Sequence, residues 1–190
     1  MGLLWTVSKL VAQTVGVLVA ETYGAKYLAG AHPALHATLW GPSAVAAMLP
    51  RAYGLVALVN VVGAAFAVVA LGLKVGAART ECGVDLPAMY ATGTDARSVR
   101  FNCVQRGHQH ALESLPALLA ASMVGGVRYP VSVAAFGLLW IKARFAWAHG
   151  YASGDPKKRY ASKWGFFIWT SLVGTFTACG AVGLEILGVL

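Results

Sequence analysis

Charged residues are scarce in this sequence. Asp, Glu, Lys and Arg make up 12% of its 190 residues, whereas soluble domains carry about 25% because their surfaces face water. Hydrophobic residues make up 58%, and the mean hydropathy is +0.65. A chain with so little polar surface cannot enclose its own core in water, so its outer surface must contact lipid. The composition therefore excludes a soluble globular protein, and the length predicts one compact membrane domain.

Acidic residues are the scarcest of the charged ones. Seven Asp and Glu stand against fifteen Lys and Arg, so the formal net charge is +8. The cations lie beside apolar stretches, and membrane topology, anionic lipid and anionic ligands therefore explain the excess better than nucleic acid does. We expect no nucleic-acid partner.

Groups of metal ligands are also missing from the sequence. The three cysteines, Cys82, Cys103 and Cys179, are odd in number and far apart. His32 and His36 have helical spacing, but no third ligand lies near them. We expect neither a disulfide framework nor a metal site.

Long apolar stretches are present, and they predict membrane-spanning helices. Residues 52–73 form a run of 22 residues without a charge, and residues 164–184 form a second uncharged run. At about 1.5 Å per residue, each run is long enough to cross a hydrocarbon core of roughly 30 Å.

Two shorter apolar stretches, residues 114–127 and 129–141, lie between the long ones. Each can cross a membrane only if its helix continues over charged neighbours, backward across residues 100–113 and forward across residues 142–151. The sequence therefore predicts an all-α, integral membrane bundle of four helices. The residues that predict a tight turn between the second and third helices are Gly125, Gly126 and Pro130.

The distribution of basic residues supports four spans. Residues 74–106 and 142–163 hold eleven of the fifteen Lys and Arg. With four spans, both stretches lie on the same side of the membrane, which the positive-inside rule assigns to the cytosol. Both ends of the four-helix unit then face away from the cytosol.

Residues 1–49 are predicted to be an extension that precedes the membrane domain of residues 50–190. Pro33 and Pro42 argue against one continuous helix in the later part of this extension. Two interpretations stay open, a cleaved organelle-targeting peptide and an additional interfacial or membrane helix.

A polar stripe precedes the second apolar stretch, in the segment FNCVQRGHQHALE of residues 101–113. Arg106, His110 and Glu113 lie at helical positions i, i+4 and i+7, and Asn102 and Gln109 extend the same face. Ionisable groups are costly to bury in a membrane, so this face is expected to line a cavity or another helix. On pattern alone, a solvated helix end explains the stripe equally well.

The third helix carries a matching set. Arg144, Trp147 and Tyr151 share one face, and Arg144 lies between apolar neighbours. Intramembrane arginines are more often ligand or ion-pair residues than lipid anchors. With Arg106 and Glu113, this face predicts a cavity for an anion that also carries a positive group. The arginines would hold carboxylates, and the glutamate would hold an ammonium group.

The segments FNCVQRGHQHALE and GYASGDPKKR are similar to those of the MAPEG family, the membrane-associated proteins of eicosanoid and glutathione metabolism. The similarity points in particular to plant-like type 3 microsomal glutathione S-transferases. It extends over residues 50–190 and includes the LPRAYG and DLPAMYA blocks. Residues 1–49 have no counterpart in this resemblance.

The resemblance implies a homotrimer in the endoplasmic reticulum membrane, although the N-terminal extension leaves another organelle membrane open. It implies glutathione sites between subunits, and conjugation of glutathione to lipophilic electrophiles or reduction of lipid hydroperoxides, as in detoxification and lipid metabolism. Glutathione would be a co-substrate, and no further cofactor is expected. A non-catalytic member of the family that binds lipid or a partner protein is the alternative.

The resemblance also implies roles for individual residues. Arg159 would activate the glutathione thiol, with Lys158 as the reserve because the alignment across GDPKKR is ambiguous by one residue. The implied glutathione-binding residues are Arg79, Arg106, His108, His110, Glu113, Ser114, Arg144, Trp147 and Tyr151. A thiol with a pKa near 8.5 is mostly protonated at neutral pH, and a nearby guanidinium would stabilise its thiolate.

Three of these residues depart from the family pattern. His110 stands where relatives usually carry Asn, while Ser114 and Trp147 stand where Tyr often occurs. These changes reshape the pocket, so the substrate preference of relatives is not transferred to this chain.

Overall fold

The computed structural model describes residues 23, 24, 26–34 and 49–189. The chain divides into two units, Met1–Leu49 and Pro50–Leu190. In the first unit most of the described residues are helical, and the amide of His32 donates to the carbonyl of Leu28 at 2.8 Å. Pro42 and His36 lie outside the described residues, and both interpretations of the extension stay predictions.

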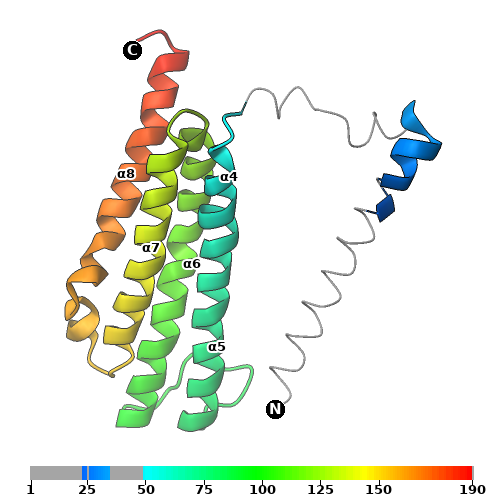
Figure 1. The fold of residues 1–190 in the computed structure, drawn as a ribbon. Coiled ribbons are helices and arrows are strands. Elements are labelled where there is room, and N and C mark those ends of the chain that lie inside the picture. Colours follow the sequence, from blue (N-terminus) through cyan, green and yellow to red (C-terminus); the bar gives the residue numbers. More distant parts are fainter. Residues whose placement is uncertain (1–22, 25, 35–48, 190) are drawn as a thin grey trace. The chain divides into compact units, whose positions relative to one another are not determined.

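Within the described part of the second unit, four helices are long and apolar enough to cross a membrane. Figure 1 shows them side by side as a bundle. The predicted all-α membrane bundle is therefore confirmed, and no strand occurs among the described residues. The elements are α4 (Tyr53–Val56), π-helical η1 (Ala57–Gly63) and α5 (Ala64–Cys82), which form one continuous helix, then α6 (Ala96–Arg128), α7 (Pro130–Tyr151), the 3-10 helix η2 (Pro156–Tyr160) and α8 (Lys163–Ile186).

The turn between α6 and α7 is shorter than predicted. Helix α6 continues through Gly125 and Gly126 to Arg128, and α7 begins at Pro130. A Cβ on Gly125 would lie 2.9 Å from the backbone nitrogen of Cys179 on α8, and one on Gly126 would lie 2.9 Å from Val56. The two glycines are required for close helix packing, and the prediction that they form the turn is wrong.

Local sequence signals fix where the helices begin and end. The Asp95 carboxylate caps α6 and accepts hydrogen bonds from the amides of Arg97 at 2.9 Å and Ser98 at 3.2 Å. The Ser98 hydroxyl also donates to Asp95, and these hydrogen bonds hold the pKa of Asp95 below its usual range. Helix α5 ends at Gly83, whose φ of 69° suits a residue without a Cβ.

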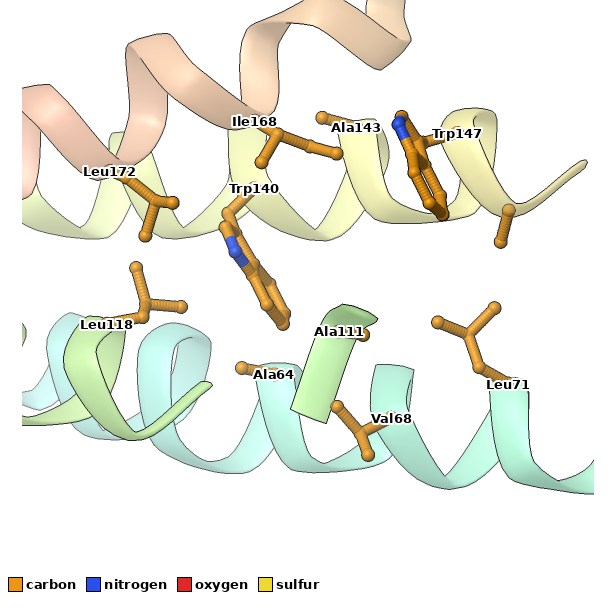
Figure 2. Close-up of a cluster of buried hydrophobic side chains, with 11 residues drawn as sticks. Ala64, Val68, Leu71, Ala111, Leu118, Trp140, Ala143, Trp147, Ile168 and Leu172 are labelled. Atoms are coloured by element: carbon orange, nitrogen blue, oxygen red, sulfur yellow. The ribbon is translucent and has the colours of Figure 1, made fainter. Parts of the chain in front are cut away.

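The core of the bundle alternates large and small side chains. Trp140 on α7 is fully buried, and Figure 2 shows its indole directed toward Ala64 of α5. Leu118 and Ile168 contribute from α6 and α8. By contrast, large apolar side chains such as Phe66 on α5 are exposed on the outer surface, as expected for a surface that contacts lipid.

One polar side chain connects three helices inside this core. Asn60, in η1, is fully buried, and its Nδ2 donates to Ser122 Oγ on α6 at 2.8 Å and to the Val133 carbonyl on α7 at 3.0 Å. A Cβ on Gly137 would collide with the Asn60 amide. Gly137 therefore provides the space in which Asn60 reaches its partners.

We expect Gly137→Ala to destabilise the bundle, because the added methyl group must displace the Asn60 amide. Overpacking of this kind typically costs about 1–3 kcal/mol. Gly180→Ala is the matched control, since no atom lies within 4 Å of its added Cβ. Unfolding in mixed micelles should show a lower free energy of unfolding for Gly137→Ala only. Equal effects of the two substitutions would contradict this account of Asn60.

Candidate functional site

Arg106 and Glu113 form a two-point ion pair on the exposed face of α6. Arg106 Nη1 lies 2.5 Å from Glu113 Oε1, and Nη2 lies 3.1 Å from Oε2. Their side chains are 38% and 46% exposed. The stripe predicted from the sequence is thus one helical face, on which opposite charges are paired and accessible to a ligand.

Arg144 lies beneath this pair and is 1% exposed. Its Nη1 is 2.7 Å from His110 Nδ1, and its Nη2 donates to Ser114 Oγ at 2.5 Å. A guanidinium only donates hydrogen bonds, so His110 must accept through Nδ1 and is the neutral tautomer protonated on Nε2. Among the described residues, no carboxylate forms an ion pair with Arg144. Two neutral groups of α6 therefore bind its terminal nitrogens, whereas its buried Nε has no hydrogen-bond partner among the described residues.

Aromatic rings of α7 continue from this cluster toward the end of the helix. The His110 ring stacks on Trp147 with centroids 4.5 Å apart and planes 25° apart. Trp147 in turn lies 4.7 Å from the ring of Tyr151. Close approach of the two helices allows this stacking, since a Cβ on Gly107 would lie 3.2 Å from Cβ of Ala148.

The loop between α5 and α6 forms one wall of the site. The Ala91 amide donates to Asn102 Oδ1 at 2.8 Å, and Asn102 Nδ2 donates back to the Ala91 carbonyl at 2.9 Å. This pairing holds the loop against α6 and allows the Tyr90 hydroxyl to donate to Gln109. Sequence reasoning missed Tyr90, because no helical spacing relates a loop residue to the stripe.

An open groove of about 390 Å³ lies between this loop, α6 and the end of α7. Its lining combines the charged stripe with aromatic and apolar groups. It consists of Tyr90, Val99, Asn102, Cys103, Arg106, Tyr151 and Pro156.

Arg159 is held at the edge of the site by the short helix η2. Its Nη1 donates to the Pro156 carbonyl at 2.7 Å, whereas the Lys158 side chain is exposed. A Cβ on Gly150 would collide with the Lys158 carbonyl, and one on Gly165 would lie 2.9 Å from the Arg159 carbonyl. Two glycines, one on α7 and one on α8, thus let the backbone of η2 pack closely against the bundle.

Tyr160 lies beside Arg159, with the Arg159 guanidinium 5.3 Å from the centre of its ring. Burial raises the pKa of Tyr160, but the hydrogen bond from Trp169 and the positive charge of Arg159 outweigh burial, so its pKa lies below the usual range. The Trp169 indole nitrogen donates to the Tyr160 hydroxyl at 3.2 Å. The N-terminal part of α8 therefore contributes to the surroundings of Arg159, which the sequence did not indicate.

Most of the predicted site residues come together within one chain. Hydrogen bonds join Arg106 to Glu113 and Arg144 to His110 and Ser114, and the rings of His110, Trp147 and Tyr151 follow one another in contact. Among the described residues, no three His, Cys, Asp or Glu side chains form a set that could hold a metal. Of the predicted residues, Arg106 and Tyr151 line the groove, and Arg159 bonds the lining residue Pro156. The residues that adjoin the groove through these contacts are His110, Glu113, Ser114, Arg144 and Trp147.

Arg79 and His108 lie elsewhere in the chain. Arg79 Nη1 donates to the carbonyls of three loop residues, Val84 at 3.1 Å, Asp85 at 3.3 Å and Ala88 at 2.8 Å. The His108 ring faces α5, where a Cβ on Gly72 would lie 3.4 Å from its Nε2. Within one subunit, Arg79 orders the loop and neither residue lines the groove.

The arrangement suits a flexible ligand that carries both signs of charge. Arg106 can take a carboxylate in two-point fashion, and Glu113 can take an ammonium group. Arg159 can stabilise a negative charge that develops at the edge of the groove. Tyr151 and Tyr90 provide hydroxyl and ring contacts on either side.

Comparison with known protein families gives a match to this chain. A model described as the MAPEG family matches residues 57–181. The match covers about two thirds of the chain, from η1 through most of α8.

We expect Asn102→Ala to release the loop wall, because both of its hydrogen bonds to Ala91 are lost. Each contributes about 0.5–1.5 kcal/mol, so hydrogen–deuterium exchange across residues 84–94 should rise roughly tenfold. Thr80→Ala is the control, since Thr80 is exposed and bonds only its own helix, at the Gly76 carbonyl. Unchanged exchange in Asn102→Ala would mean that Arg79 alone orders the loop.

Proposed function

The chain belongs to the MAPEG family, and from this premise we propose that it is a membrane-bound glutathione transferase or peroxidase. Members of this family bind glutathione and act on lipophilic substrates. The observation that carries the proposal is the accessible Arg106–Glu113 pair at the groove. Glutathione has two carboxylates and one ammonium group, which are the charges that this pair can accept.

Binding exchanges one ion pair for two. The Arg106 guanidinium takes a glutathione carboxylate, and the Glu113 carboxylate takes the ammonium group. Exposed ion pairs contribute only about 0–1 kcal/mol to stability, so an incoming ligand separates this one at little cost. Arg144, His110 and Ser114 form a fixed floor, because the burial of Arg144 leaves them little freedom to rearrange.

Arg159 activates the thiol in this proposal. The guanidinium stabilises the thiolate, which is the nucleophilic form of sulfur. In conjugation, the thiolate attacks an electrophilic carbon, a C–S bond forms, and the leaving group departs with the bonding electrons. In reduction, the thiolate attacks the terminal oxygen of a hydroperoxide, the O–O bond breaks, and an alcohol leaves while glutathione becomes a sulfenic acid. The thiol of a second glutathione then attacks this sulfur, water leaves, and the disulfide forms. Glutathione is a co-substrate, and no further cofactor takes part.

We propose a homotrimer in which neighbouring subunits complete the site. Arg79 uses one terminal nitrogen for the loop carbonyls, so the other side of its guanidinium can serve a ligand held by a neighbour. His108 would contribute in the same way. The apolar outer surface brings lipophilic co-substrates from the bilayer, with the endoplasmic reticulum as the proposed location.

Arg106→Ala should weaken glutathione binding. Hydrogen bonds to charged groups contribute about 1.5–3 kcal/mol, so the dissociation constant should rise roughly ten- to hundredfold. Arg128→Ala is the control, since Arg128 also forms an ion pair with a glutamate, Glu185 at 3.4 Å, but at the opposite end of α6 from the groove. Equilibrium dialysis of detergent-solubilised protein measures both. Loss of affinity in both variants would point to a general charge effect.

Arg159→Ala should retain glutathione binding but lose turnover. Removing a group that stabilises charge in the transition state typically lowers kcat by about 10²–10³, and the ultraviolet absorbance of the bound thiolate should fall at neutral pH. Lys158→Ala should change kcat little, because its side chain is exposed. The reverse result would assign thiol activation to Lys158. Binding without turnover in the unmodified protein would favour the non-catalytic alternative.

A further inference from the structure

A second cavity, of about 250 Å³, lies between α5, α6 and α7 at the end of the bundle where α5 ends and α6 begins (Figure 1). Its lining shares no residue with that of the groove. We call it the basic pocket and define it by three basic side chains and an apolar floor. These are Lys74, Arg100 and His149, and Leu71, Ala78 and Ala148.

In the part of the chain that the structure describes, the positive charge of the basic pocket is only partly balanced. Arg100 pairs with Glu81 at 2.9 Å, and both side chains are about half exposed. Lys74 lies over the ring of Phe145, 5.5 Å from its centre. Among the described residues, no carboxylate forms an ion pair with Lys74 or His149. An anion that enters the pocket can therefore contact the side chains of Lys74 and His149 without breaking an existing ion pair.

The basic pocket also crosses the boundary between hydrocarbon and water. The uncharged run of the first helix ends just before Lys74. The floor residue Leu71 is buried, and Glu81 lies at the rim. From Lys74 to Glu81 the helix rises about 10 Å, which is enough to span the polar head-group region of one leaflet, roughly 5–8 Å.

We propose that the basic pocket binds the phosphate head group of an anionic membrane lipid. The cations hold the phosphate, and the apolar floor contacts the first methylenes of the lipid. The volume is below the roughly 300–1,000 Å³ of pockets that enclose whole small molecules, so most of the ligand must lie outside, as acyl chains in the bilayer do. Anionic lipids are enriched in the cytosolic leaflet, which is the side that the basic loops indicate.

The test measures lipid binding to the full-length protein by native mass spectrometry from an uncharged detergent. Phosphatidic acid and phosphatidylcholine with the same acyl chains are the probes, and inorganic phosphate is the competitor. We expect phosphatidic acid to bind more tightly than phosphatidylcholine. Lys74→Gln should weaken this binding about fivefold, the usual contribution of one lysine near an anionic head group. Inorganic phosphate should not displace the lipid at equal concentration.

Lys142→Gln is the matched control. Lys142 is also an exposed lysine over an aromatic ring, that of Trp164, but it does not line the basic pocket. Thermal unfolding checks that each variant is folded, and His149→Gln replaces Lys74→Gln if the latter is not. Equal loss in Lys142→Gln, equal binding of the two lipids, or displacement by inorganic phosphate at equal concentration would each overturn the proposal.

Discussion

The buried charge of Arg144 is the constraint on which the site depends. A cation with no carboxylate partner is costly inside a membrane protein, so its polar neighbours cannot be exchanged freely. His110 must remain a neutral acceptor, and Ser114 must present its hydroxyl. Both residues belong to α6, whereas Arg144 belongs to α7. These two hydrogen bonds therefore also fix the rotation of one helix against the other, and with it the direction of the whole polar stripe.

The exposed ion pair of Arg106 and Glu113 differs from the buried Arg144 cluster in that a ligand can separate it. Arg106 and Glu113 neutralise one another without being buried, so they are stable without a ligand and remain easily separated. A rigid part and an exchangeable part of the site thus follow from the same helix, because His110 and Ser114 of α6 contact α7 whereas Arg106 and Glu113 contact one another. The residues around Arg144 are therefore ordered before a ligand binds, and Arg106 and Glu113 can still present one positive and one negative charge to it.

Composition and helical spacing predicted much of this architecture. Uncharged runs located two spans, the charge asymmetry supported the other two, and the i, i+4, i+7 pattern placed Arg106, His110 and Glu113 on one face. Spacing could not predict contacts that depend on how helices approach. Their sequence neighbours made Gly125 and Gly126 resemble a turn, although their role depends on the backbone of α8 and on side chains of the first helix. Tyr90 and Arg79 depend on the path of a loop, which has no periodicity to interpret.

The close packing at Gly150 and Gly165 has a consequence for how the site can vary. The position of η2 is determined by its main chain, since the carbonyls of Lys158 and Arg159 are the atoms nearest to the two glycines. The two glycines thereby determine the position of the backbone at residue 159, and the identity of that residue determines which functional group lies there. Substitutions in η2 can therefore change the functional group at this place during evolution while the bundle stays the same. By contrast, a methyl group added to Gly150 or Gly165 would displace the backbone of η2 and every side chain that it carries.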